Sequence, residues 1–135
     1  EILAQWICFD KAPSKSLIKP QNAHLLTLNL SRIDELADGI ESIKRELAGA
    51  FILESNKNLA SLQNAYAQKN WELWATAAHL IKGGAATAGA EKLFFLCREA
   101  QVFSGSDDER FSLFEQIRSE YQAVLDFFRH ASLAP

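Results

Sequence analysis

The residues best suited to chemistry are a histidine followed three and four positions later by a lysine and a glycine: His79, Lys82 and Gly83. A neutral imidazole is a nucleophile, because its ordinary pKa of about 6.5 leaves one ring nitrogen unprotonated near pH 7. An ammonium group beside it can balance the charge on phosphoryl oxygens. On one face of a helix, these residue types predict a histidine that accepts a phosphoryl group and becomes phosphohistidine.

A helical wheel predicts that His79 points to solvent. When residues 70–88 are placed at about 100° per residue, the apolar arc is centred nearly opposite the imidazole. This arc contains Leu73, Trp74, Ala77, Leu80, Ile81, Gly84, Ala85 and Ala88. Within about 60° of the imidazole lie Lys82 and the residues that we expect a partner to contact: Glu72, Ala75, Thr76, Gly83 and Ala86. Most of these are small, so the surface of a partner can approach this face closely.

Two consecutive glycines, Gly83 and Gly84, follow on the next turn. Each costs a helix roughly 0.5–1 kcal/mol relative to alanine. Gly83 stands four residues after His79, where a longer side chain would crowd the imidazole. A lone histidine is more often an ordinary surface or core residue, but that interpretation explains neither the small neighbours nor the glycine.

A second polar side chain is expected near the imidazole. If the chain folds back at Gly89, residues equally far from the turn face each other in antiparallel helices. His79 lies ten residues before Gly89, and Gln101 lies twelve after it. The amide of Gln101 has donor and acceptor groups, so it can orient the imidazole or bind the phosphoryl group. The spacing alone is equally consistent with an ordinary exposed glutamine near a helix end.

Helical spacing of apolar residues extends through almost all of the sequence after residue 29. Helix starts are predicted at Ser31, at Asn70 and at Ser106, the last with Glu109 in a capping box, and a helix end is predicted at Gly89. Short connections favour antiparallel neighbours. We therefore predict an all-α fold: an antiparallel up-and-down four-helix bundle in residues 30–135, preceded by an N-terminal helix and linker in residues 1–29.

The composition limits the class of protein. The 135 residues carry a net charge of −3, which disfavours nucleic acid as the main partner, and no apolar run is long enough to span a membrane. The two cysteines, Cys8 and Cys97, lack the spacing of a metal or redox site, which favours a reducing, cytoplasmic setting. Cys97 falls among apolar residues and is expected in the core. The chain starts at Glu1 and has no methionine, so we expect it to be part of a longer protein.

Residues 77–101, AAHLIKGGAATAGAEKLFFLCREAQ, resemble the signature of histidine-containing phosphotransfer (HPt) domains of multistep phosphorelays. The resemblance extends more loosely over residues 30–131. It implies that His79 accepts a phosphoryl group from the aspartate of one receiver domain and passes it to another. It also implies that Lys82 supplies a charge beside the phosphoryl group and that Gly83 leaves room for the receiver. Gln101 matches a glutamine that some fungal and plant members carry near the histidine.

The resemblance also sets expectations about partners. Such domains bind no ATP and complete their chemistry only in complex with a receiver, so no cofactor or metal site is expected here, and Mg²⁺ would come from the receiver. Receiver domains are the expected partners of a chain that is monomeric in isolation and makes no direct membrane contact. Residues 1–7, EILAQWI, resemble the end of a receiver's last helix. The chain is therefore expected to be the C-terminal module of a hybrid sensor histidine kinase, whose other parts tether it to the inner face of the membrane.

The sequence is also compatible, to different degrees, with four other functions. A chemotaxis-type kinase shares His-x-x-Lys-Gly, but its phosphotransfer domain usually has a second histidine where Cys97 stands. A kinase dimerisation domain usually has an acid after the histidine, where this sequence has Leu80. A metal or haem bundle needs ligands that project inward, whereas His24, His79 and His130 are dispersed along the sequence. A helical interaction module that has lost phosphotransfer would have the same helical pattern.

Overall fold

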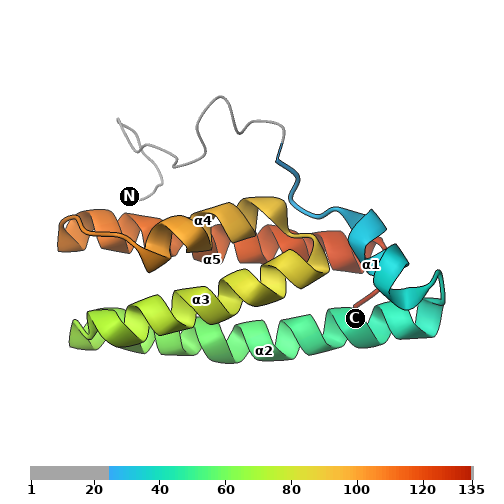
Figure 1. The fold of residues 1–135 in the computed structure, drawn as a ribbon, viewed down its shortest axis with the longest axis horizontal. Coiled ribbons are helices and arrows are strands. Elements are labelled where there is room, and N and C mark those ends of the chain that lie inside the picture. Colours follow the sequence, from blue (N-terminus) through green and yellow to red (C-terminus); the bar gives the residue numbers. More distant parts are fainter. Residues whose placement is uncertain (1–24, 135) are drawn as a thin grey trace.

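The computed structural model describes residues 25–134, so the helix and linker predicted within residues 1–24 lie outside the described residues. Five helices follow: α1 (Leu30–Ala37), α2 (Glu41–Gln68), α3 (Trp71–Ala88), α4 (Glu91–Gln101) and α5 (Asp107–His130). Helices α2 to α5 form an antiparallel bundle, and α1 packs against α2 and α3 at one end of it (Figure 1). The predicted all-α bundle is confirmed, and α1 lies within the residues predicted to form it. No helix in this part of the chain is long and apolar enough to cross a membrane.

Side-chain caps explain where the helices begin. Ser106 and Glu109 form the predicted capping box at the start of α5, through hydrogen bonds of 2.9 and 3.1 Å. Asn70 caps α3 as predicted, accepting a 3.1 Å hydrogen bond from the backbone N–H three residues later. The predicted cap at Ser31 is wrong, because Asn29 is the residue that accepts from the first turn of α1. The Ser31 hydroxyl itself donates to the Asn29 side chain over 2.6 Å.

The turn between α3 and α4 requires glycine. Gly89 ends α3 with a φ of 83°, in the left-handed region, so the predicted helix end is confirmed. A Cβ at this position would lie 2.5 Å from the carbonyl oxygen of Asn29. The Asn29 N–H in turn donates to the Gly89 carbonyl over 2.7 Å. The segment before α1 is therefore packed directly on the turn that joins α3 to α4.

Trp74 anchors α3 in the core. Its side chain is among the largest that are fully buried, and its indole N–H donates to the carbonyl oxygen of Ala100 in α4 over 2.8 Å. On the buried side of α3, the short side chains of Ala77, Ala78 and Ala85 let the neighbouring helices approach closely. Helix α3 accordingly lies between α2 and α4, with extensive contacts to both (Figure 1).

The wheel prediction is wrong for Leu80, which is 51% exposed rather than part of the core. Leu80 stands at the edge of the predicted apolar arc, where an open groove of about 210 Å³ separates α1, α2 and α3. The residues lining this α1–α2–α3 groove include Leu36, Ala50 and Gly84. Because Ala50 and Gly84 are small, they leave the groove unfilled, and Leu80 borders it from the solvent side.

Replacing Trp74 with Phe should lower the free energy of unfolding by about 1–3 kcal/mol, because it removes a buried hydrogen bond and leaves a small cavity. Urea denaturation measures this loss. Trp71→Phe is the matched control, since Trp71 is only half-buried and its indole N–H makes no hydrogen bond with residues 25–134. Equal losses in the two variants would contradict the importance of the bond between Trp74 and Ala100.

Candidate functional site

His79 lies near the middle of α3 with its side chain exposed, so the outward orientation predicted by the wheel is confirmed. The two residues before it, Ala77 and Ala78, are buried in the core. The imidazole makes no hydrogen bond or ion pair with any residue in 25–134. The described part of the chain therefore engages neither ring nitrogen, which suits a nucleophile that meets its substrate on another molecule.

Lys82 lies one turn after His79 and is half-buried. Its positive charge acts on the thiol of Cys97 in α4, so the ammonium group lies on the side of α3 that faces α4. Lys82 forms no ion pair with the described residues. A lysine without a carboxylate partner can attract an anion that reaches His79.

The two glycines after Lys82 meet different surroundings. A Cβ built on Gly84 would lie 3.5 Å from the ring of Phe51 in α2, so this position is in ordinary packing contact with a neighbouring helix. A Cβ built on Gly83 would meet nothing within 4 Å. The bundle therefore places no steric demand on Gly83, although glycine weakens the helix there. Packing within the described residues therefore does not explain the glycine, and the clearance for a partner that the sequence suggests stays a prediction.

The other residues expected to contact a partner lie around His79 on the same helix. Glu72 and Thr76 are exposed, whereas Ala75 and Ala86 are half-buried. The Thr76 hydroxyl donates to the carbonyl oxygen of Glu72 over 3.1 Å, so it is turned back onto the helix. Most side chains around the imidazole are therefore short or folded back onto α3. Contact of these residues with a partner stays a prediction.

Gln101 is the last residue of α4, and its side chain is half-buried. The Trp74 indole bond to Ala100 places this end of α4 beside the first turn of α3. Trp74 precedes His79 by about 7 Å along the helix axis, so the bond ties the end of α4 to a side chain on the N-terminal side of His79. A helical side chain leans toward the N-terminus of its helix, which directs the imidazole toward this end of α4. The amide of Gln101 makes no hydrogen bond with residues 25–134, including His79.

Cys97 is completely buried beneath this face, as the sequence predicts. Burial raises the pKa of its thiol well above the usual range, and the nearby charge of Lys82 only partly opposes this effect. The neutral thiol is a poor nucleophile at neutral pH. The chemistry of the site therefore cannot be assigned to the cysteine next to it.

In a Cys8→Ser background, the Cys97 thiol should resist a maleimide reagent at pH 7.5 until the chain is unfolded, because the thiol is both buried and protonated. Mass spectrometry of samples treated with and without urea measures the modification. Rapid labelling of the folded chain would contradict the buried position of Cys97.

Arg110, at the start of α5, is a feature that the sequence reasoning missed. It is 5% exposed, and its guanidinium lies 4.1, 5.0 and 5.4 Å from the ring centroids of Trp71, Phe103 and Trp74. Its Nε is buried without a hydrogen-bond partner, so the aromatic faces supply much of its stabilisation. Arginine is usually exposed, so only the number of aromatic residues nearby hinted at this cluster. The cluster fixes the beginning of the helix that carries His79.

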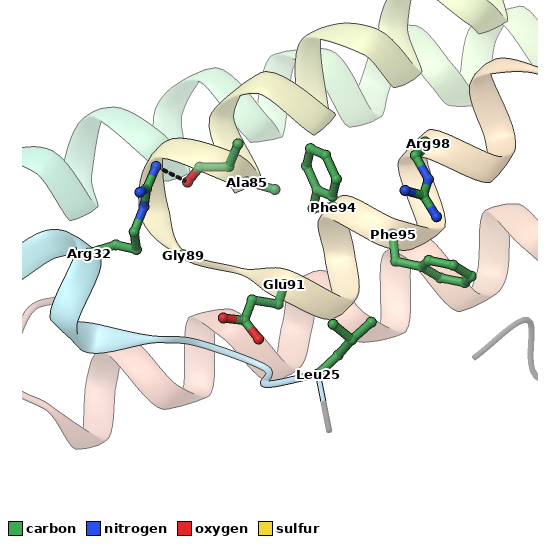
Figure 2. Close-up of a pocket in the computed structure, with 9 residues that line it drawn as sticks. Leu25, Arg32, Ala85, Gly89, Glu91, Phe94, Phe95 and Arg98 are labelled. Carbon is green, nitrogen blue, oxygen red and sulfur yellow. Dashed lines mark hydrogen bonds between the residues drawn. The ribbon is translucent and has the colours of Figure 1, made fainter. Parts of the chain in front are cut away.

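A second groove, drawn in Figure 2, includes Ala85 and Ala86 of α3, whereas the α1–α2–α3 groove includes Leu80, Gly84 and Thr87 on the other side of the same helix. This α3–α4 groove has a volume of about 410 Å³, and its lining residues are Leu25, Arg32, Ala85, Ala86, Gly89, Glu91, Phe94, Phe95 and Arg98. Ala86 belongs both to this groove and to the surface around His79. The groove was not predictable from helical periodicity, because residues 25 and 32 line it together with residues 85–98, more than 50 positions later in the sequence.

Metal-ligating side chains do not gather in the described part of the chain: no three or more His, Cys, Asp or Glu residues lie together there. The polar side chains of interest here are those of His79 and Lys82 on α3 and of Gln101 at the end of α4, and no hydrogen bond or ion pair joins any two of them. A metal ion is bound by carboxylates, imidazoles or thiolates in larger number. The arrangement suits transfer of an anionic group, with the rest of the chemistry supplied from outside.

Comparisons with known proteins agree with this geometry. A family model described as the Hpt domain matches residues 46–127, which include all of α3 and α4. The chain is similar to the crystal structure of histidine-containing phosphotransfer protein B (HptB) from Pseudomonas aeruginosa PAO1, with a TM-score of 0.68 and 25% sequence identity. That match covers 78% of this chain and 93% of the other. A comparison with curated protein sequences gave no match.

Proposed function

Because the chain belongs to the Hpt domain family, we propose that its His79 accepts a phosphoryl group from the aspartyl phosphate of a receiver domain and passes it to the aspartate of another. The observation that carries this proposal is the exposed imidazole of His79 beside Gly83, a glycine that the packing of the bundle does not require. The histidine-containing phosphotransfer protein that the fold resembles supports the same reaction class.

The transfer follows from the chemistry of the two reacting side chains. An unprotonated ring nitrogen of His79 attacks phosphorus, a P–N bond forms, and the P–O bond to the aspartate breaks. The aspartate leaves as a carboxylate, while the proton of the imidazole stays on its other nitrogen. Transfer to a second receiver is the same step in reverse, with an aspartate oxygen as the nucleophile. Any Mg²⁺ is expected on the receiver, and no step assigned to this chain uses it.

Lys82 and Gln101 have complementary roles in this proposal. The ammonium of Lys82 lies on the α4 side of α3 and lacks a carboxylate partner among the described residues, so it can offset charge on the transferring oxygens. The amide of Gln101 is likewise unoccupied by the described residues, and it can donate to the phosphoryl group or orient the imidazole. In this proposal, the Lys82 ammonium and the Gln101 amide are bound to a partner group only when the phosphoryl group is present.

The surface around His79 suits the docking of a folded domain. Ala75, Ala86 and Gly83 present almost no side chain, and Thr76 folds back onto α3. A receiver can therefore bring its aspartate within reach of the imidazole without displacing any bulky group. We also propose that the chain is a module of a hybrid sensor kinase, because residues 1–7 resemble the end of a receiver helix.

Replacing His79 with Gln should abolish phosphoryl acceptance and leave the fold unchanged, because the exposed imidazole makes no contact on which the described residues depend. The chain is incubated with a panel of phosphorylated receiver domains, and acid-labile, base-stable label on it is counted. Circular dichroism reports the thermal midpoint.

His130→Gln is the matched control for this experiment, since His130 is also exposed and lies at the far end of α5, where its Nδ1 contacts the Asp126 carbonyl oxygen over 2.8 Å. The control should accept label like the wild-type chain. Label that persists in His79→Gln would show that another residue is the acceptor.

Replacing Gly83 with Ala should raise the free energy of unfolding by about 0.5–1 kcal/mol, because the added methyl group meets open space and the helix gains propensity. Gly83→Gln should also fold normally, but its long side chain should slow transfer from a receiver by about 10- to 100-fold, since a displacement near 1 Å has effects of that size. A time course of phosphoryl transfer, with samples quenched at intervals, measures the rates for both variants and the wild-type chain. Transfer to Gly83→Gln at the wild-type rate would contradict the need for clearance.

A further inference from the structure

Three cations, Arg32, Lys82 and Arg98, lie along one side of the His79 face. Elsewhere in the described part of the chain, ion pairs with carboxylates are formed by Lys44, Arg45, Lys57, Lys69, Arg118 and Arg129. Lys92 lies near the carboxylate of Glu120, and Arg110 is enclosed by aromatic rings. Arg32 and Lys82 form no ion pair with a carboxylate within residues 25–134, whereas Arg98 forms an exposed one with its neighbour Glu99, across 3.9 Å.

Two of these cations, Arg32 and Arg98, line the α3–α4 groove from opposite ends (Figure 2). The Arg32 guanidinium is held loosely by a 3.4 Å hydrogen bond to the carbonyl oxygen of Ala86. The Arg98 guanidinium lies 5.2 Å from the ring centroid of Phe95. Between them, the ring of Phe94 faces the groove (Figure 2). The groove therefore combines an apolar floor with exposed guanidinium groups at its rim.

The one carboxylate that lines this groove, Glu91, keeps its negative charge but forms no ion pair with either arginine, so the lining residues carry two positive charges and one negative charge. Glu91 Oε1 accepts from the backbone N–H of Leu26 over 3.0 Å, and Glu91 Oε2 accepts from the side chain of Asn29 over 3.1 Å. Neither oxygen pairs with Arg32 or Arg98. Glu91 instead fastens the segment before α1 to the start of α4, which helps to hold Arg32 in place.

The other groove beside His79 has the opposite character. Among the residues lining the α1–α2–α3 groove, the only charged one is Glu54, and most of the others are apolar. The two sides of the His79 face are therefore electrostatically distinct. A partner with carboxylates near its reactive group has one favourable orientation, in which those carboxylates face α4.

We propose that the α3–α4 groove is the part of the docking surface that binds acidic side chains of the receiver domain, through Arg32 and Arg98. This inference rests on the proposed function, since it orients the partner that phosphorylates His79. A phosphoryl group carries roughly −1.5 to −2 charge near pH 7, so the reacting surface of the receiver is itself anionic. The two exposed arginines of the groove attract that surface before contact and fix its rotation about the axis through His79.

The test is the rate of phosphoryl transfer from phosphorylated receivers to the double variant Arg32→Glu/Arg98→Glu, compared with the wild-type chain. Reversal of two interfacial charges should slow transfer by at least about tenfold at low ionic strength, and added salt should reduce the difference. Arg32→Gln/Arg98→Gln should show an intermediate loss. Arg118→Glu/Arg129→Glu is the matched control, because it changes the net charge equally on α5, which makes no close backbone approach to α3.

Direct labelling of His79 by phosphoramidate, which requires no receiver, separates the possible outcomes. Equal phosphoramidate labelling with slowed transfer in the arginine variants alone supports the proposal. Transfer at the wild-type rate in Arg32→Glu/Arg98→Glu, or an equal loss in the α5 control, overturns the role of the groove and leaves the proposed function standing. A wild-type chain that phosphoramidate labels but no receiver labels overturns the proposed function, and this inference with it. Circular dichroism shows that each variant is folded.

Discussion

The rotation of α3 about its own axis is the constraint on which the rest of the site depends. Trp74 fixes that rotation from one side, through complete burial and the indole bond to Ala100 in α4. The aromatic cluster around Arg110 holds the first turn of the same helix. A change of one residue in register would rotate α3 by about 100° and carry His79 toward a neighbouring helix. The orientation of the reactive imidazole is thus set by a tryptophan more than one turn away.

Small residues serve two separate purposes along α3, and only the structure distinguishes them. Gly84 touches the ring of Phe51, so its size is a matter of packing between α2 and α3. A Cβ at Gly83 would touch nothing in the bundle, so packing does not explain its size, and the proposed function supplies a reason in the approach of a partner surface. In the sequence these two residues are adjacent and identical. The difference between them comes entirely from their positions about 100° apart on the helix.

Much of the fold was predictable because local signals agreed with one another. Asn70, Ser106 and Gly89 mark helix ends by hydrogen-bonding chemistry and by φ, both of which are local properties. The outward orientation of His79 followed from periodicity alone. Leu80 was misplaced because a wheel treats the surroundings of a helix as uniform, whereas a groove lies beside it. Arg32, Arg98 and the cluster around Arg110 were missed because their importance depends on contacts between distant segments.

The free chain leaves its reactive groups unsatisfied, and this has a consequence for specificity. His79, Lys82 and Gln101 have no hydrogen-bonded or ionic partners within residues 25–134, so the chain alone does little to orient the imidazole or to bind the phosphoryl group. In the proposed function, their joint action requires a partner that supplies the phosphoryl group in the correct position. Under the same proposal, selection among partners comes from the surfaces around the site, since the three groups themselves suit any aspartyl phosphate. The unequal charge of the two grooves beside α3 provides such a basis, because it favours one orientation of an acidic partner.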